Sequence, residues 1–197
     1  MSSADFTLSS PRVIELVNGG ISYIEEEILQ CNSCALHETV TNKVIGKGSE
    51  SPKVVFIGEA PGKNEDETGI PFCGRAGKNL DEMIDYMGLS ENDYAVINTI
   101  KCRPPNNRNP HVTEINACKT FLLAQISLLD PKVIILLGNT AEKAFCKNRK
   151  LDWGVAEKTD EGNVVLLKLF HPAALIYKRS RIDEQKSLID ENRPLWE

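Results

Sequence analysis

Four short apolar runs recur along the chain, and each is followed by a turn and then by a segment with helical spacing. They cover residues 53–57, 94–98, 132–137 and 164–170. The third run is continuously apolar, which is typical of a strand covered on both faces. Strands that alternate with helices form parallel sheets packed between helices. We therefore predict an α/β fold, a three-layer α/β/α sandwich around a central four-stranded parallel sheet.

Helical spacing is found before and between these runs. The predicted helices carry their apolar faces on Val13, Leu16 and Val17; on Ile21, Ile24 and Ile28 after a break at Gly19-Gly20; on Leu80, Met83, Ile84 and Met87 up to Gly88; and on Ile115, Cys118, Leu122 and Ile126 up to Pro131. Two more are expected over residues 138–145 and 182–191. With 197 residues the chain fits a single domain, 1–197, with a loose tail and a helical arm over about residues 1–30.

Polar groups follow three of the predicted strands directly. An acidic stretch, Gly58-Glu59-Ala60-Pro61-Gly62 with Glu65-Asp66, follows the first, and Asn98 and His171 each follow another. In a parallel sheet the carboxyl ends of the strands share one edge, where ligands bind. We therefore expect these three groups to form one site.

Six cysteines are present, and Cys31-x-x-Cys34 has the spacing of a metal or redox site. A thioredoxin-type redox pair lies between a strand and a helix of the sheet, whereas this pair precedes the first strand, which favours metal. Cys102 and Cys118 are expected to complete the site, and four sulfurs suit either tetrahedral zinc or a four-iron cluster. We expect the remaining two, Cys73 and Cys146, to be small buried residues.

Composition limits the classes of partner. The longest apolar run is far too short to span a bilayer, and no signal segment opens the chain, so we expect a cytosolic protein without membrane contact. The formal net charge is −5, so a nucleic-acid partner would need a locally basic face. Two clusters qualify: Lys101, Arg103 and Arg108, and Lys178, Arg179 and Arg181.

Four ordered motifs together resemble one family. They are Gly58-Glu59-Ala60-Pro61-Gly62 with Glu65-Asp66; Gly69-Ile70-Pro71-Phe72-Cys73-Gly74-Arg75-Ala76-Gly77; Asn98-Thr99-Ile100-Lys101-Cys102-Arg103-Pro104-Pro105; and His171-Pro172-Ala173. With the four cysteines, this set resembles the family 4 uracil-DNA glycosylases. The resemblance implies an enzyme of base excision repair with a 4Fe-4S cluster on Cys31, Cys34, Cys102 and Cys118. It would hydrolyse the N-glycosidic bond of uracil in single- or double-stranded DNA, leaving an abasic site.

The resemblance also implies roles for the residues at the sheet edge. Phe72 would stack on the flipped base, and Asn98 would read the uracil edge, whose donor and acceptor pattern cytosine reverses. Gly58, Ala60 and Gly62 would form the pocket wall. His171 would donate to uracil O2 as negative charge develops on the leaving base.

The acidic loop departs from other branches of the superfamily, which carry Asp or Asn where Ala60 stands. We expect Glu59 to position the attacking water, with Glu65 and Asp66 as supporting acids. A related branch carries a bulky residue at Gly62 that excludes the thymine methyl, so this chain must exclude it elsewhere. Cys73 stands where the family commonly has Val.

For the DNA strand, the resemblance and the charge clusters together suggest seven contact residues: Lys101, Arg103, Arg108, Ala173, Leu175, Lys178 and Arg179. Residues 175–177 would supply an apolar wedge for the gap left by the flipped base. Because the chain is acidic overall, we expect weak, salt-sensitive DNA binding by a monomer.

Two other functions fit parts of the pattern. A sibling branch attaches covalently to the abasic sugar through a histidine in an inserted basic loop; residues 103–111 lack that insertion, although His111 lies nearby. A zinc-stapled nucleic-acid-binding domain without chemistry is the third possibility.

Overall fold

Six strands form one sheet in the computed structural model, which describes residues 10–146, 149–159, 163–178 and 180–197. The strand order is β1-β3-β2-β4-β6-β5. The four central strands are parallel: β3 (Tyr94–Asn98), β2 (Val54–Gly58), β4 (Val133–Leu137) and β6 (Val165–Leu169). This confirms the predicted parallel centre.

Two short strands correct the predicted strand number. β1 (Lys47–Gly48) pairs antiparallel with β3, and β5 (Glu157–Lys158) pairs antiparallel with β6. A two-residue strand has no apolar period of its own, so neither strand could be recognised from residue spacing.

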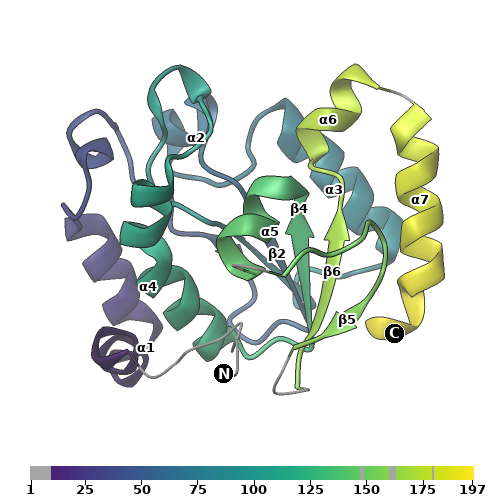
Figure 1. The fold of residues 1–197 in the computed structure, drawn as a ribbon, viewed down its shortest axis with the longest axis horizontal. Helices are drawn as coiled ribbons and strands as arrows, with labels where there is room; N and C mark the ends of the chain where they lie inside the picture. The colour runs from purple at the N-terminus through teal and green to yellow at the C-terminus, as the bar shows by residue number, and fades with distance from the viewer. Residues whose placement is uncertain (1–9, 147–148, 160–162, 179) are drawn as a thin grey trace.

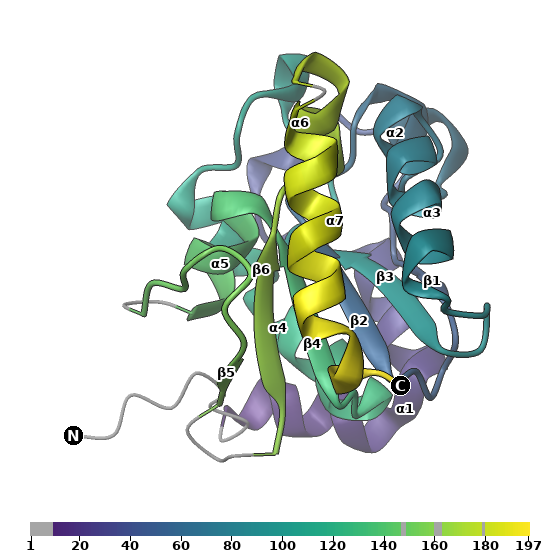
Figure 2. The same ribbon diagram turned by 90° about the vertical axis from the view of Figure 1, so that its right-hand side faces the viewer.

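Helices cover both faces of the sheet, as Figures 1 and 2 show. Successive strand residues point to opposite faces, so Val54 and Phe56 pack with α3 (Arg75–Met87) and α7 (Ser180–Asn192). Val55 and Ile57 pack on the other face with α4 (Val112–Leu129) and α5 (Gly138–Cys146). The three-layer sandwich is therefore confirmed.

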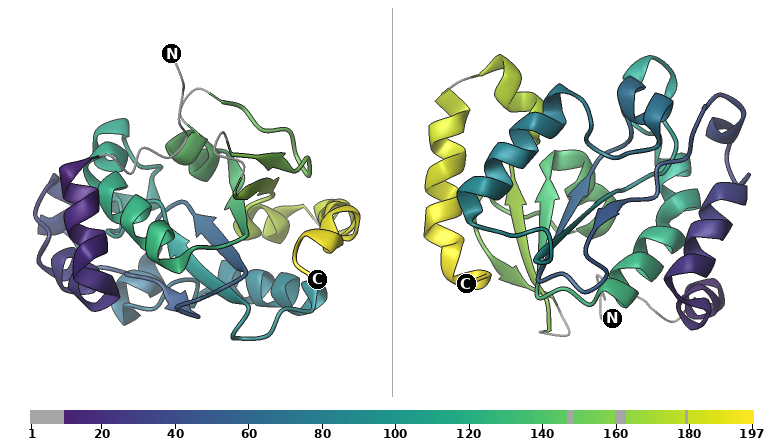
Figure 3. Two further views of the ribbon diagram at one scale, coloured as in Figure 1. Left: turned by 90° about the horizontal axis from the view of Figure 1, so that it is seen from below. Right: turned by 180° about the vertical axis from the view of Figure 1, so that it is seen from behind.

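The N-terminal helical arm is α1 (Pro11–Gln30), which packs on the outer side of α4 (Figure 3). Its backbone leaves helical geometry at Gly20, where φ is 82°. Val13, Leu16, Ile24 and Ile28 are its buried residues, in agreement with the predicted face and break. The helix ends next to Cys31, so this packing places the first cysteine pair beside α4.

The remaining elements are short: α2 (Lys63–Thr68), α6 (Pro172–Tyr177), and the 3-10 turns η1 (Ala35–Glu38), η2 (Pro105–Asn107) and η3 (Arg193–Leu195). The sequence analysis treated the acidic stretch that includes α2 as a loop and assigned no element to the segment of α6, because six residues are too few for a helical period. Both helices lie above the carboxyl edge of the sheet, at the top of Figure 1. Within the described ranges, no helix combines the length and the apolar character needed to cross a membrane.

Candidate active site and metal centre

One pocket lies at the carboxyl edge of the sheet and joins the three groups predicted to converge there. Its volume is about 960 Å³, including the part open to solvent. It is lined by Glu59, Ala60, Pro61, Gly62, Glu65, Phe72, Ala76, Asn98, Pro104, Asn107, Arg108, His171 and Ala173. The acidic loop after β2, Asn98 at the end of β3 and His171 after β6 therefore meet as expected.

The floor of this pocket depends on the missing side chain of Gly58. A Cβ at Gly58 would lie 2.3 Å from Oδ1 of Asn98 and 2.7 Å from Cζ of Phe72. Asn98 itself is 2% exposed, and its Oδ1 is buried without a hydrogen-bond partner among the described residues. A buried amide oxygen that lacks a partner is costly, so it is suited to accept a hydrogen bond from a ligand.

Phe72 reaches the pocket through an unusual backbone conformation. Its φ is 51°, in the left-handed region, and a Cβ at Gly77 would lie only 1.7 Å from the Phe72 carbonyl oxygen. The Phe72 ring is buried, and its centroid lies 5.9 Å from that of His171. Because the chain turns at Phe72, Cys73 points outward and is exposed, so the expected burial of Cys73 is wrong. Cys146 is buried, as predicted.

His171 is held as a neutral hydrogen-bond donor. Its Nδ1 accepts a hydrogen bond from the Ala173 backbone N–H at 3.2 Å, at the start of α6. In the neutral ring the proton must then lie on Nε2. Burial lowers the pKa of His171 from 6.5 to about 4, so the ring is neutral near pH 7. Nε2 is therefore the ring nitrogen that can donate a hydrogen bond.

The carboxylates of the acidic loop have different surroundings. Glu65 lies in the first turn of α2, where one oxygen accepts from the Gly62 N–H at 3.0 Å and the other from the Gly74 N–H at 3.1 Å. Asp66 is buried and accepts from the Thr41 N–H at 2.9 Å. Both acids tie loops together, so the structure favours the supporting role for Glu65 over a catalytic one. Glu59 lines the pocket, and no described residue forms a hydrogen bond with its carboxylate.

Several lining residues were missed by the sequence analysis. Pro104 and Asn107 come from the proline-rich segment after β3, and Ala76 opens α3. Asn106 and Asn107 have φ values of 55° and 54°, a conformation that Asn tolerates better than most residues. The Pro-Pro-Asn-Asn sequence was therefore an available signal for a turn placed against the pocket.

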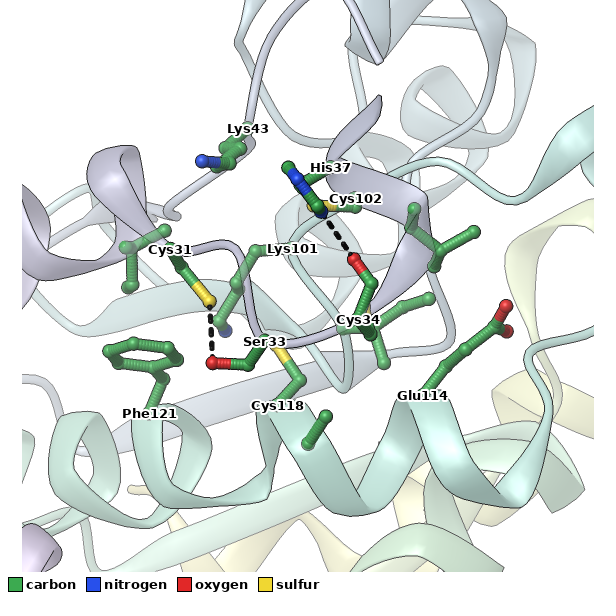
Figure 4. A pocket seen from close by; sticks show the side chains of 14 residues that line it. Cys31, Ser33, Cys34, His37, Lys43, Lys101, Cys102, Glu114, Cys118 and Phe121 are labelled. Atoms are coloured by element: carbon green, nitrogen blue, oxygen red, sulfur yellow. Dashed lines mark hydrogen bonds between the residues drawn. The ribbon is translucent and has the colours of Figure 1, made fainter. Parts of the chain in front are cut away.

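A second pocket, shown in Figure 4, contains all four predicted metal ligands. Cys31 and Cys34 follow α1, Cys102 follows β3, and Cys118 lies on α4. Its volume is about 380 Å³, and Ile28, Leu36, Ile100 and Phe121 add apolar walls. The expected grouping of these cysteines is thus present.

The four cysteines line one cavity, as either cofactor left open by the sequence requires. Within the described residues, no three His, Cys, Asp or Glu side chains are gathered closely enough to share one ion. Tetrahedral zinc binds every sulfur at about 2.3 Å, whereas a four-iron cluster gives each thiolate its own iron. The cavity therefore shows which four side chains would hold a metal cofactor.

Burial raises the pKa of two of these thiols. For Cys102 the pKa rises to about 12, first through burial and then through the nearby Cys118. The pKa of Cys118 is also raised by burial, while the ammonium of Lys101 lowers it in part. With both pKa values raised, these thiols are protonated near pH 7, and a metal ion bound to them would displace the protons.

A family model described as the uracil DNA glycosylase superfamily matches residues 45–193. The chain belongs to this superfamily. A type-4 uracil-DNA glycosylase of Thermotoga maritima is 40% identical over 167 residues, which cover 80% of this chain and 83% of the relative. One from Archaeoglobus fulgidus is 39% identical over 173 residues, covering 83% and 87%. A type-5 uracil-DNA glycosylase of Pyrobaculum aerophilum is more distant, with 29% identity over 115 residues, or 51% and 50%. The resemblance stated from the motifs is thereby confirmed.

For a superfamily member, the predicted phosphate contacts need one clear correction. Lys101 is 2% exposed and donates to the Asn98 carbonyl oxygen at 2.7 Å, so it does not face a DNA strand. Arg108 lies at the pocket rim, but both its terminal nitrogens bind the Glu114 carboxylate, at 2.9 and 2.6 Å. In this structure, Lys101 and Arg108 therefore form hydrogen bonds within the protein that stabilise the segment after β3.

The other predicted contacts have mixed positions. Arg103 is half-buried and donates to Oδ1 of Asn107, whereas Lys178 is exposed. Arg179 lies outside the described residues. Leu175 is buried and lines a hollow with Met83 and Ile189, between α3 and α7. This position corrects the prediction that Leu175 is part of an apolar wedge. Because α6 turns Leu175 toward the core, this side chain cannot enter a duplex in this conformation.

Proposed function

We propose that this protein is a type-4 uracil-DNA glycosylase, which hydrolyses the bond between uracil and deoxyribose in DNA. The observation that carries the proposal is the buried Oδ1 of Asn98, which has no hydrogen-bond partner among the described residues and shares one pocket with the Phe72 ring and a neutral His171. Membership of the superfamily and similarity to type-4 relatives support the same activity.

Base recognition follows from the chemistry of the Asn98 amide. Its oxygen accepts from uracil N3–H, while its NH₂ group donates to uracil O4. Cytosine presents an acceptor at N3 and a donor at its exocyclic amine, so both hydrogen bonds would be lost. Phe72 offers an aromatic face on which a base drawn out of the duplex can stack.

Bond cleavage is divided between His171 and Glu59. As the C1′–N1 bond lengthens, its electron pair moves into the uracil ring and negative charge reaches O2, where His171 Nε2–H donates. Positive charge develops on the sugar, and the Glu59 carboxylate stabilises it and orients a water molecule toward C1′. The water oxygen bonds to C1′, and its proton leaves through Glu59 and ends on the uracil anion.

The four cysteines would hold a 4Fe-4S cluster. When bound, the cluster supplies iron–thiolate bonds that tie the end of α1, the segment after β3 and α4 to one another. Residues 104, 107 and 108 of the second segment line the uracil pocket. The role of the cysteine ligands is thus to fix the pocket wall, while the residues at the sheet edge perform the reaction.

Uracil release from oligonucleotides with a single uracil tests the proposal. Asn98→Ala and His171→Ala should each lower kcat/KM by about 10²–10³ through lost transition-state hydrogen bonds. His111→Ala is the matched control, because His111 is exposed and does not line the pocket. Full activity in both pocket variants would overturn the assignment. A denaturant-resistant DNA adduct that disappears in His111→Ala would favour the covalent alternative.

A further inference from the structure

Lys101 lies between the cysteine pocket and the uracil pocket. Its side chain lines the cysteine pocket, where Figure 4 shows it beside Cys118. Its Nζ donates to the backbone oxygen of Asn98, three residues earlier, at 2.7 Å. One side chain therefore contacts the residue that reads the base while standing among the metal ligands.

The burial of Lys101 needs an electrostatic explanation. Taking an ammonium out of water is costly unless an anion or several hydrogen bonds compensate it. Lys168 is equally buried, at 2% exposure, but has Glu142 at 2.9 Å. Among the described residues, Lys101 forms no ion pair with a carboxylate, and the acceptor of its Nζ is the Asn98 backbone oxygen. This hydrogen bond therefore compensates part of the cost of burying the amine, which ties the position of Asn98 to that of Lys101.

The contact with Asn98 is specific to the backbone and leaves the amide free. Asn98 ends β3 and lines the uracil pocket, and its Oδ1 has no hydrogen-bond partner among the described residues. Beyond Asn98, the Thr99 N–H and hydroxyl both donate to the Gly58 carbonyl oxygen at 2.9 Å. In addition to these contacts with β2, Lys101 holds the Asn98 carbonyl oxygen with a side chain that lines the cysteine pocket.

We propose that Lys101 is a positioning residue for base recognition, which holds Asn98 in place from the cysteine pocket. The inference rests on the proposed function, because it concerns how the same pocket reads uracil. It replaces the phosphate contact assigned to Lys101 from the sequence.

Two variants of the cofactor-loaded protein test the proposal. Lys101→Met removes the donor at similar length, and Lys101→Gln keeps a neutral donor that reaches one bond less far. In either variant we expect the dissociation constant for free uracil to rise by about tenfold to a hundredfold, as for loss of a buried hydrogen bond. Uracil binding is measured by equilibrium dialysis and by product inhibition, and iron content per protein is measured alongside.

These readouts separate positioning from folding. A variant that is partly unfolded binds uracil at fewer sites, but its remaining sites keep the wild-type dissociation constant. The control is Lys168→Met with Glu142→Gln, which removes an equally buried lysine far from both pockets together with its partner. It should leave the uracil dissociation constant unchanged.

Each result has a definite reading. A raised dissociation constant with wild-type iron content supports the positioning role. An unchanged constant in whichever Lys101 variant folds, or an equal rise in the control, overturns it. If the wild-type protein releases no uracil from DNA, the proposed function itself has failed, which is a different outcome from an active wild type with unaffected Lys101 variants.

Discussion

At the scale of the residue, the space left by Gly58 controls the uracil pocket. A Cβ there would overlap both Asn98 Oδ1 and the Phe72 ring, the two groups that meet the base. In Gly58→Ala we therefore expect kcat/KM to fall by about 10² or more, since misplacement by even 1 Å has that effect. Overpacking should lower the free energy of unfolding by only about 1–3 kcal/mol. Single-turnover kinetics and urea unfolding measure the two effects.

Gly46 provides the matched control for Gly58. Its Cβ would lie 2.9 Å from Cγ2 of Ile97, a similar crowding beside the sheet but away from the pocket lining. Gly46→Ala should lose stability by a similar amount and keep its kcat/KM. Equal kinetic losses in the two variants would show that crowding of the sheet, and not the position of Asn98 and Phe72, limits the rate.

The protonation of His171 leads to a prediction on pH. In the unfolded chain a histidine takes up a proton below about pH 6.5, but the folded pKa is about 4. The unfolded state therefore binds more protons between these values, and the unfolding free energy should fall as pH drops from 6.5 to 4. His171→Gln should show a smaller fall, measured by urea unfolding at several pH values. Parallel curves for both proteins would mean that the native pKa is unshifted.

At the scale of the element, α2 separates two acids that the sequence placed in one loop. Glu65→Ala frees the Gly62 and Gly74 N–H groups, so we expect a loss of about 1–2 kcal/mol in unfolding free energy. Glu59→Gln should leave stability within about 0.5 kcal/mol of wild type. It should lower kcat by about 10²–10⁴, as expected for loss of a group that activates water.

Urea unfolding and kcat, measured on the same preparations, distinguish the two carboxylates. The pair is informative because both side chains line one pocket but only Glu65 has backbone partners. If Glu65→Ala abolishes turnover without loss of stability, the assignment of the two acids is reversed.

The sequence could predict the central elements because each has its own period. The spacing of apolar residues predicted the four long strands, the buried face of α3 and the break at Gly20. Because the strands were predicted to be parallel, Asn98 and His171 were expected at the same edge of the sheet. The positions of Lys101 and Leu175 could not be predicted, because tertiary packing determines whether a basic or apolar side chain outside the regular elements points to the core or to solvent. The outward direction of Cys73 depends on the left-handed φ of Phe72. This conformation is uncommon for a residue other than glycine, so the sequence does not indicate it.

At the scale of the whole molecule, the cysteine pocket connects the outer helical arm to the sheet edge. Cys118→Ala should remove the proposed cluster, and with it the broad absorption near about 400 nm expected of an iron–sulfur centre. Because cofactor binding is coupled to folding, we expect the unfolding free energy and uracil release to fall together. Metal analysis, absorption and urea unfolding provide the measurements.

Cys73→Ala is the control for this change, since Cys73 is exposed and does not line the cysteine pocket. It should keep full iron content and absorption. A colourless wild-type protein with one zinc ion would instead contradict the cluster.

The balance of charge over the molecule leads to the last prediction, the salt dependence of DNA binding. The formal net charge is −5, and among the predicted phosphate contacts Lys101 is buried and Arg108 is paired with Glu114, so fewer of these cations can meet phosphates. Each phosphate neutralised contributes about −0.9 to the slope of log K against log salt, so we expect a slope of only about −2 to −4. Arg103→Gln should reduce this slope by about 1 if its guanidinium turns from Asn107 to a phosphate, whereas Lys101→Met should leave it unchanged. Binding titrations of a uracil-free oligonucleotide at several salt concentrations measure these slopes. A shallower slope in Lys101→Met would show that Lys101 contacts a phosphate after all.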